Sequence, residues 1–294
     1  MSAAASGRTP ARLWVALQYV LPQHLLTQLV HALTRSRIRW LKDALIGSFV
    51  RRFHPDMRDA VQSDPLGYES FNAFFTRALR VDARPAYPDP AAVVSPVDGT
   101  VSQLGRLDGS WLLQAKGHAY TLESLLAGEA VTWAQAFRGG SFATLYLAPA
   151  NYHRIHMPLA GTLRAAWYVP GQLFSVNAAT AASVPGLFAR NERVVCVFAA
   201  GELVFALVLV GALFVGSMST VWHGEVTPRR PRAFTALPLE SGLASFTLAR
   251  GAEVARFNMG STVIVLLPAG KSAWRAPLAA GSALRVGEML GRLT

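Results

Sequence analysis

Residues 203–222, L-V-F-A-L-V-L-V-G-A-L-F-V-G-S-M-S-T-V-W, decide what kind of fold this chain can adopt. These twenty residues carry no charge, and a run of that length is typical of a membrane-spanning helix. The run is rich in valine, which favours strands, and it is interrupted by Gly211 and Gly216. Polar residues close it at 217, 219 and 220. We therefore expect two buried strands joined near Gly211 rather than one helix in a membrane.

Short apolar runs like these occur over most of the chain, both before and after this stretch. Short apolar runs alternate with Gly, Pro and Asn from residue 91 onward, which is typical of a β-rich domain. The clearest runs are 92–101, 141–149, 162–171 and 192–198, and a last strand is expected at 262–267. One short helix is expected at 121–127. With 52% hydrophobic and 15% charged residues, the chain can bury a large core, which excludes wholesale disorder.

The N-terminal part has a different pattern. Helices are expected over 11–60, and Ile38, Leu41, Leu45 and Phe49 lie on one face of such a helix. A further helix is expected over 64–80, with three phenylalanines (71, 74 and 75) on one side. Residues 81–90 hold three prolines and are expected to form a linker pinned by Arg84, with Arg77 in the same role. The predicted fold class is α+β: a helical region at 1–62 and a β-rich catalytic domain at 63–294.

Positive charge is concentrated in this helical region. The whole chain has a net charge of +11, and residues 1–58, with nine basic and two acidic residues, hold +7 of it. Basic residues interspersed with Leu, Val and Trp are typical of a membrane-surface helix, whereas a nucleic-acid protein would carry its basic stripe on the folded domain. The uncharged stretch 13–34 could span a bilayer by length, but its glutamines, histidines and proline favour the interface. The alternative is an ordinary helical cap packed on the catalytic domain.

The sequence has no pattern of a cleavable signal peptide at its start, so we expect the chain on the cytoplasmic side of the cell membrane as a peripheral protein. The single cysteine, Cys196, excludes a disulfide framework. His153 and His156 form a His-x-x-His pair, but no Cys or further His nearby completes a metal site, so no metal is expected.

Ser261 is the residue whose position indicates chemistry. It follows Gly260 in a turn directly before the last strand, and the G-x-S-x-G pattern of a serine hydrolase is absent around it. Glycine allows a side chain to approach its carbonyl closely. If Ser261 Oγ attacks the Gly260 carbonyl, the peptide bond becomes an ester, and removal of the Ser261 Cα proton then releases the Gly260 carboxylate. The dehydroalanine left behind hydrolyses to a pyruvoyl group and ammonia, which divides the chain into 1–260 and 261–294.

A series of motifs extends from about residue 71 to the end: F-F-T-R (74–77), A-R-P (83–85), S-P-V-D-G (95–99), K-G-H (116–118), Y-H-R-I-H-M-P (152–158), P-G-Q-L-F-S-V-N (170–177), N-E-R-V-V (191–195), V-G-S with T-V-W (215–217 and 220–222) and F-N-M-G-S-T (257–262). Together, in this order and spacing, they resemble the phosphatidylserine decarboxylases of the bacterial, pyruvoyl-dependent type. The family's self-cleavage motif usually has Leu where this chain has Met259, a swap of similar volume.

The resemblance implies a role for each matching residue. Ser261 becomes the pyruvoyl cofactor, His156 acts as its base during self-cleavage, and Asp98 orients His156. His153 matches the histidine implicated in decarboxylation itself. The loop formed by Leu173, Phe174 and Ser175 resembles the substrate entrance, and His118 is a weaker candidate for substrate binding.

The function that the resemblance implies is decarboxylation of phosphatidylserine to phosphatidylethanolamine through a Schiff base with the pyruvoyl group. The expected partners are phosphatidylserine in an anionic membrane and the two products of cleavage, an alpha and a beta chain that stay together and pair as a dimer; nucleic acid is not expected. Two alternatives remain open: a soluble pyruvoyl-dependent decarboxylase of a free amino acid, and an inactive membrane-binding scaffold.

Overall fold

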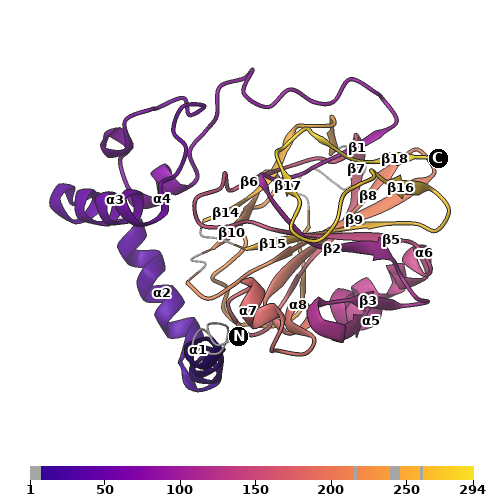
Figure 1. Cartoon of the computed structure of the whole chain (residues 1–294), viewed down its shortest axis with the longest axis horizontal. Coiled ribbons are helices and arrows are strands. Elements are labelled where there is room, and N and C mark those ends of the chain that lie inside the picture. Colours follow the sequence, from indigo (N-terminus) through magenta and orange to yellow (C-terminus); the bar gives the residue numbers. More distant parts are fainter. Residues whose placement is uncertain (1–7, 215–216, 239–245, 259–260) are drawn as a thin grey trace, which may run out of the picture.

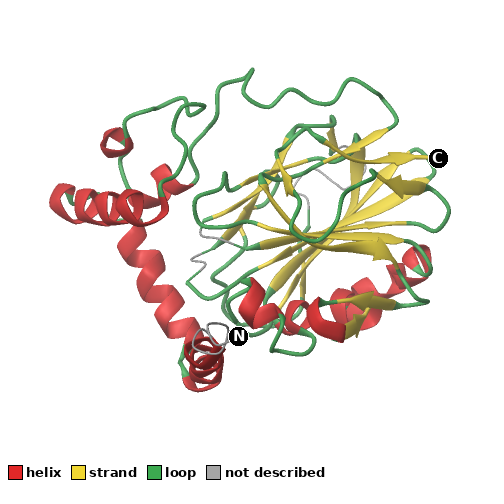
Figure 2. Cartoon of the chain, in the orientation of Figure 1, coloured by secondary structure: helices red, strands yellow, loops and turns green. Residues whose placement is uncertain are grey.

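The computed structural model describes residues 8–214, 217–238, 246–258 and 261–294. It consists of an N-terminal arm of helices that runs along one side of a β-rich body (Figure 1). Strands fill the body, and short helices cover part of one of its sides (Figure 2). The predicted α+β class, with helices first and strands after them, is confirmed.

The arm consists of three helices: α1 (Arg8–Val20), α2 (Gln23–Thr34) and α3 (Arg39–Phe53). Pro22 separates the first two because it has no backbone N–H to continue the helix. α3 ends at His54, whose left-handed backbone (φ 48°) donates the last backbone hydrogen bond, to Val50 O at 3.0 Å. Helices therefore fill most of the predicted region, but residues 54–60 are not helical. None of the described helices has both the length and the apolar character needed to cross a membrane.

The helix predicted over 64–80 is wrong except for its centre. Only α4 (Phe71–Phe75) and a 3₁₀ turn (Pro65–Gly67) form there, each started by a side-chain cap, from Ser70 and Asp64 respectively. The three phenylalanines do share one side, as expected. They pack with Ile46 and Phe49 of α3 in a small apolar core separate from that of the β body.

A nine-stranded antiparallel sheet forms the centre of the body, and its strands lie in the order β12-β7-β8-β9-β15-β5-β2-β17, with β13 also on β7. Its central strand β15 (Thr262–Leu267) is buried along its whole length and pairs with β9 (Leu203–Val210) and β5 (Ser141–Tyr146). The other strands are β2 (Gly99–Arg106), β7 (Gly161–Val169), β8 (Arg193–Ala200), β12 (Thr235–Ala236), β13 (Thr247–Leu248) and β17 (Ala283–Leu284).

The uncharged run 203–222 forms strands, as predicted. β9 takes its first half and ends at Val210, directly before Gly211, and β10 (Met218–Thr220) lies in its second half. The two strands belong to different sheets. β9 pairs with β8 on one side and with β15 on the other, so it is an inner strand of the sheet. Its long apolar run is explained by this buried position.

Smaller sheets and short helices complete the body. A four-stranded sheet has the order β11-β10-β14-β6, a three-stranded sheet has the order β1-β18-β16, and β3 pairs with β4. The strands are β1 (Ala92–Val94), β3 (Trp111–Leu113), β4 (Ala119–Thr121), β6 (Arg154–His156), β11 (Gly224–Glu225), β14 (Glu253–Phe257), β16 (Ser272–Trp274) and β18 (Met289–Leu293). The helices are α5 (Leu122–Leu126, which confirms the helix predicted at 121–127), α6 (Ala134–Phe137), α7 (Ala178–Ala181) and α8 (Leu187–Arg190), and 3₁₀ turns lie at Ala115–Gly117 and Gly128–Trp133.

The topology brings distant parts of the chain to one end of the nine-stranded sheet. Thr262, at the start of β15, pairs with both the last residue of β5 and the last residue of β9. β2 starts beside the end of β5, since Thr100 pairs with Tyr146. β7 ends beside the start of β8 at this same end of the sheet. The segments that carry Asp98, the two histidines, the 170–177 loop and Ser261 therefore all enter or leave the sheet at this end.

Candidate active site

Ser261 lies immediately before the central strand and is fully buried. Its carbonyl accepts a hydrogen bond from the Leu147 N–H at 2.9 Å, which fixes the backbone at the head of β15. Its Oγ has no hydrogen-bond partner within the described part of the chain. Buried hydroxyls are normally paired, so the Ser261 hydroxyl is unsatisfied among the described residues, as are ten other buried side-chain atoms. The predicted cleavage partner Gly260, with Met259, lies outside the described residues.

His153 is also fully buried at this end of the sheet. Its Nδ1 donates to the Asn151 carbonyl at 2.8 Å, and this carbonyl can only accept, so Nε2 of the neutral ring holds the lone pair. Nε2 lacks a partner among the described residues. Burial lowers the pKa of His153 to about 3, and its ring packs on Phe75 with the ring centroids 4.1 Å apart. His153 is therefore a neutral imidazole with a free acceptor nitrogen.

His156 is the last residue of β6, and both of its ring nitrogens are occupied. Nδ1 donates to the Gly251 carbonyl at 2.7 Å, and Nε2 accepts from the Tyr152 hydroxyl at 3.1 Å. Burial lowers the pKa of His156, and it raises the pKa of Tyr152 to about 12, so the two groups face each other uncharged. The Gly251 carbonyl fixes the tautomer that leaves Nε2 unprotonated, which is the form a general base requires.

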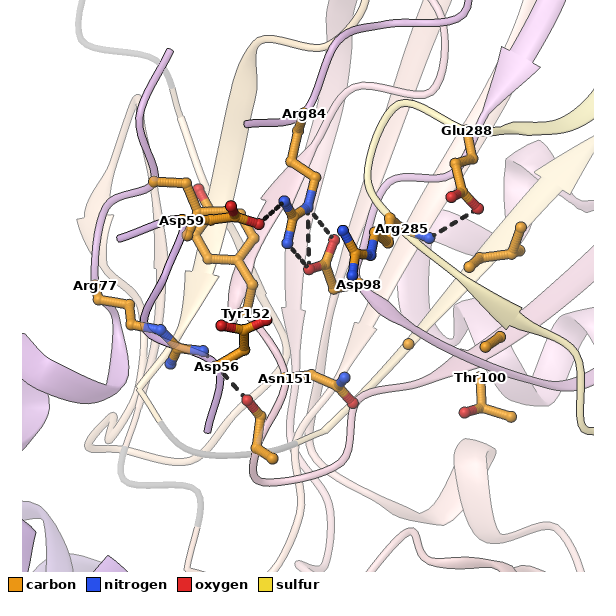
Figure 3. A pocket seen from close by; sticks show the side chains of 15 residues that line it. Asp56, Asp59, Arg77, Arg84, Asp98, Thr100, Asn151, Tyr152, Arg285 and Glu288 are labelled. Carbon is orange, nitrogen blue, oxygen red and sulfur yellow. Dashed lines mark hydrogen bonds and ion pairs between the residues drawn. The ribbon is translucent and has the colours of Figure 1, made fainter. Parts of the chain in front are cut away.

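Asp98 is buried at the start of β2 and binds the guanidinium of Arg84. Arg84 Nε lies 2.9 Å from Oδ1, Arg84 Nη2 lies 2.6 Å from Oδ2, and the Val286 N–H donates to Oδ1 at 2.8 Å. Arg84 Nη1 also binds Asp59 at 2.8 Å, so one guanidinium joins two carboxylates (Figure 3). The hydrogen bonds with Asp98 raise the pKa of Arg84. This cluster borders a cavity of about 320 Å³ that Tyr152 also lines.

Backbone hydrogen bonds connect the segments that carry the three residues predicted to act in self-cleavage, but among the described residues their side chains do not bind one another. The His156 N–H donates to the Pro96 carbonyl at 2.8 Å, two residues before Asp98, and the Phe257 N–H donates to the His153 carbonyl at 3.0 Å, four residues before Ser261. In the described ranges no side-chain hydrogen bond joins Asp98, His156 and Ser261 to one another.

A mostly apolar cavity of about 250 Å³ lies beside the head of β15. Its lining includes Leu147, the backbone partner of Ser261, together with Phe49 and Phe53 of the arm. The remaining lining residues are Phe75, Tyr146, Pro149, Ser175, Val176, Asn177, Ala212, Leu213 and Phe214. Its size and apolar walls suit part of a lipid molecule.

Only some of the residues predicted from the sequence to bind substrate line this cavity. Ser175 lines this cavity, whereas Leu173 and Phe174 are buried and are not part of its lining. His118 follows the 3₁₀ turn Ala115–Gly117 and is not part of the cavity lining. Within the described residues, no group of three or more His, Cys, Asp or Glu side chains converges as a metal site.

Two residues of the site were not identified as functional from the sequence. Arg84 was expected only to pin the linker; it does so by binding the predicted active-site residue Asp98. Tyr152 precedes His156 by four residues, and its hydroxyl covers the nitrogen that the predicted role of His156 requires. The sequence signal for both was their place inside the A-R-P and Y-H-R-I-H-M-P motifs.

The arm presents large apolar side chains to solvent. Leu13 and Val20 of α1, Leu25 and Leu29 of α2, and Trp40 of α3 are all more than half exposed. Several large exposed apolar side chains on a basic segment are typical of a surface that contacts a membrane or a protein.

Comparison with known proteins finds relatives that all carry the same protein name. A family model described as phosphatidylserine decarboxylase matches residues 71–292, and a second, described as PSD, matches residues 13–54. A phosphatidylserine decarboxylase proenzyme of Pseudomonas fluorescens is 51% identical over 95% of this chain and 97% of its own length. A proenzyme of the same name from Methylococcus capsulatus is 49% identical over 96% of this chain and 97% of its own length.

Proposed function

The chain belongs to the phosphatidylserine decarboxylase family, and from this premise we propose that it converts phosphatidylserine to phosphatidylethanolamine with release of CO₂. It acts as a carbon–carbon lyase after cutting itself between Gly260 and Ser261. The observation that carries the proposal is the buried Ser261 hydroxyl, which is unpaired among the described residues, at the head of a buried strand and beside an apolar cavity of about 250 Å³.

Self-cleavage uses groups of this chain alone. Ser261 Oγ attacks the Gly260 carbonyl carbon, the C–N bond breaks and an ester forms. A base takes the Ser261 Cα proton, and the Cβ–O bond breaks with its electron pair, which leaves on the Gly260 carboxylate. The resulting dehydroalanine tautomerises and takes up water, and ammonia leaves. The strand β15 retains the new N-terminus, because all six of its residues are buried between β5 and β9.

We assign the base in self-cleavage to His156, oriented by Asp98. His156 has the required tautomer, since Nδ1–H donates to Gly251 and Nε2 carries the lone pair. To act, its ring must exchange the Tyr152 hydroxyl for the reacting group. Asp98 is bound by Arg84 and lies two residues from the backbone carbonyl that binds the His156 N–H.

We assign His153 to decarboxylation. A pyruvoyl group at position 261, once joined to the substrate amine, supplies an electron sink for the negative charge left at Cα when CO₂ departs. The position fits such a group, because its side chain is buried, has no described partner and adjoins the cavity through Leu147. His153, neutral and with the Nε2 lone pair free, can accept a hydrogen bond from the substrate, and it can deliver a proton to the substrate Cα once Nε2 has taken one up.

We further propose that residues 1–62 associate with the cytoplasmic face of the cell membrane and that residues 63–294 form the catalytic domain. The exposed apolar side chains of the arm support the first statement, and the arm phenylalanines that line the cavity connect it with the second. The alpha and beta chains remain together as a heterodimer, and two such units are expected to pair.

Mass spectrometry of the purified protein tests the proposal. The expected result is two chains separated at Gly260–Ser261, with a small chain of 34 residues whose N-terminus is a pyruvoyl group rather than an amine. The purified protein should release CO₂ from phosphatidylserine vesicles. An intact, inactive chain would overturn the proposal and favour a scaffold. Activity on free serine equal to that on the phospholipid, without flotation on liposomes, would favour a soluble amino-acid decarboxylase.

A further inference from the structure

Three consecutive backbone N–H groups of the substrate loop are bound by side-chain amides rather than by backbone carbonyls. The Leu173 N–H donates to Gln23 Oε1 at 2.7 Å, the Phe174 N–H to Asn191 Oδ1 at 3.1 Å, and the Ser175 N–H to Gln18 Oε1 at 2.7 Å. Backbone groups that are buried without partners are costly, so these amides determine where the loop can lie.

Two of the three amides belong to the arm, about 150 residues away in sequence. Gln18 is fully buried near the end of α1, and Gln23, also buried, is the first residue of α2. Gln23 Nε2 also donates to the Gln18 carbonyl at 2.7 Å, which ties the two helices together at Pro22. Buried glutamines are rare unless their amides are paired, and here both amide oxygens are directed at the loop.

Further contacts join the same turn of the arm to the same loop. His24 Nε2 donates to the Gly171 carbonyl at 3.0 Å. The rings of Tyr19 and Phe174 lie 4.8 Å apart, and the Arg190 guanidinium lies over both. The turn between α1 and α2 is thus fixed to residues 171–175.

The third amide connects the loop to a second segment of the cavity lining. Asn191 Nδ2 donates to the Phe174 carbonyl at 2.8 Å and to the Gly211 carbonyl at 2.9 Å. Residues 212–214, which follow Gly211, and residues 175–177 both line the cavity. A displacement of the α1–α2 turn would therefore move the loop relative to these walls.

On the basis of the proposed function, we propose that Gln18 and Gln23 are positioning residues that hold the 173–175 loop in the shape required for the substrate. The arm is then a structural part of the substrate site as well as a membrane anchor. The two roles lie on different faces of the same helices, because Leu13, Leu17 and Val20 of α1 are exposed whereas Gln18 is buried.

The test uses Gln18→Met and Gln23→Met in the full-length, self-cleaved enzyme. Methionine is close to glutamine in size and shape, but its thioether sulfur is only a weak acceptor and cannot replace the amide oxygen that binds the loop. The matched control is Gln28→Met, because Gln28 lies on α2 and its Oε1 binds Arg230 rather than the loop. Rates are expressed per pyruvoyl group and measured on a short-chain phosphatidylserine below its micellar concentration and on anionic vesicles containing long-chain phosphatidylserine.

We expect kcat/KM on the monomeric short-chain substrate to fall about tenfold in each loop-facing variant and to stay at the parent value in the control, a loss of the size expected from one buried hydrogen bond. Flotation on the vesicles should be unchanged. Hydrogen exchange provides a readout of the contact itself: the Ser175 amide should exchange faster in Gln18→Met and the Leu173 amide faster in Gln23→Met.

A parent-like kcat/KM on the monomeric substrate would overturn the proposal. So would a loss seen only on vesicles together with lost flotation, since the arm would then be an anchor alone. Faster exchange at both amides with unchanged kinetics would also overturn it, because the loop would be loosened without consequence. Failure of the proposed function would appear differently, as absence of CO₂ release from the parent enzyme itself.

Discussion

The ion pair between Arg84 and Asp98 gives the most direct test of how the linker supports the site. Replacing Arg84 with methionine removes the cation that binds two carboxylates and leaves the Asp98 carboxylate with one hydrogen bond among the described residues, from the Val286 N–H. The side chains of Arg84 and Asp98 are only 13% and 10% exposed, so neither charge is well hydrated without the other. The change should therefore destabilise the fold and release Asp98 from its fixed orientation.

The expected magnitude follows from this burial. Removing one partner of a buried ion pair typically costs about 3–5 kcal/mol, and the open cavity beside Asp98 admits water that lowers the cost to roughly 2–3 kcal/mol. In a domain of this size each kcal/mol changes Tm by about 2–4 °C, so Tm should fall by about 4–12 °C.

Thermal unfolding is best compared in a Ser261→Ala background, in which no chain is cut and all variants have the same covalent structure. Arg58→Met is the matched control, because Arg58 also binds an aspartate, Asp56, but is 85% exposed, and its Tm should not change. Adding Asp98→Asn to Arg84→Met should restore part of the lost Tm, since it removes the unpaired carboxylate. With Ser261 present, Arg84→Met should also slow the appearance of the two chains. Equal Tm changes in the Arg84 and Arg58 variants would refute the reasoning.

Three further predictions concern the reacting serine, a buried histidine and the arm. Ser261→Ala should leave one intact chain on a denaturing gel and abolish CO₂ release, and an active uncut variant would contradict the assignment. His153 has a folded-state pKa of about 3, below its unfolded value near 6.5, so from pH 6.5 downward the unfolded state gains a proton that the native state does not. In chemical unfolding, His153→Gln should therefore reduce the loss of stability between pH 6.5 and 5 by up to about 1.4 kcal/mol per pH unit, and an unchanged pH slope would count against the burial argument. Trp40→Asp should weaken flotation on anionic vesicles at least several-fold, because an exposed arm tryptophan becomes a charge, whereas Trp111→Asp on β3, exposed but part of the body, should not.

The elements that could be predicted from the sequence are those whose own residues dictate the conformation. The strand at 262–267 was predicted with the bounds that β15 has, because six consecutive apolar or β-branched residues after Gly260 and Ser261 permit little else. The helix expected over 64–80 failed because aromatic spacing at 71, 74 and 75 describes one turn only, whereas Pro65, Gly67 and the Ser70 cap divide the flanking sequence.

The candidate site was only partly accessible from the sequence for a related reason. The motifs identified which residues to examine, and the sheet topology brings those segments together at one end of the body (Figure 1). Their hydrogen-bond partners could not be inferred from spacing. His156 binds a carbonyl 95 residues away, and the loop at 173–175 binds glutamines about 150 residues away. No periodicity relates such positions, because the contacts depend on how separate elements pack.

This distribution of contacts suggests why the arm and the site coincide at one end of the molecule. The substrate's acyl chains belong in a bilayer while its headgroup must reach a buried position, so the path between the two has to be short. Phe49 and Phe53 line the cavity next to Ser261 from α3, and Gln18 and Gln23 hold the loop from α1 and α2. If the arm were only a tether, its inward face would need no such polar contacts, because apolar packing alone would hold it at lower desolvation cost. Its two buried amides are explained if the arm also determines the shape of the site.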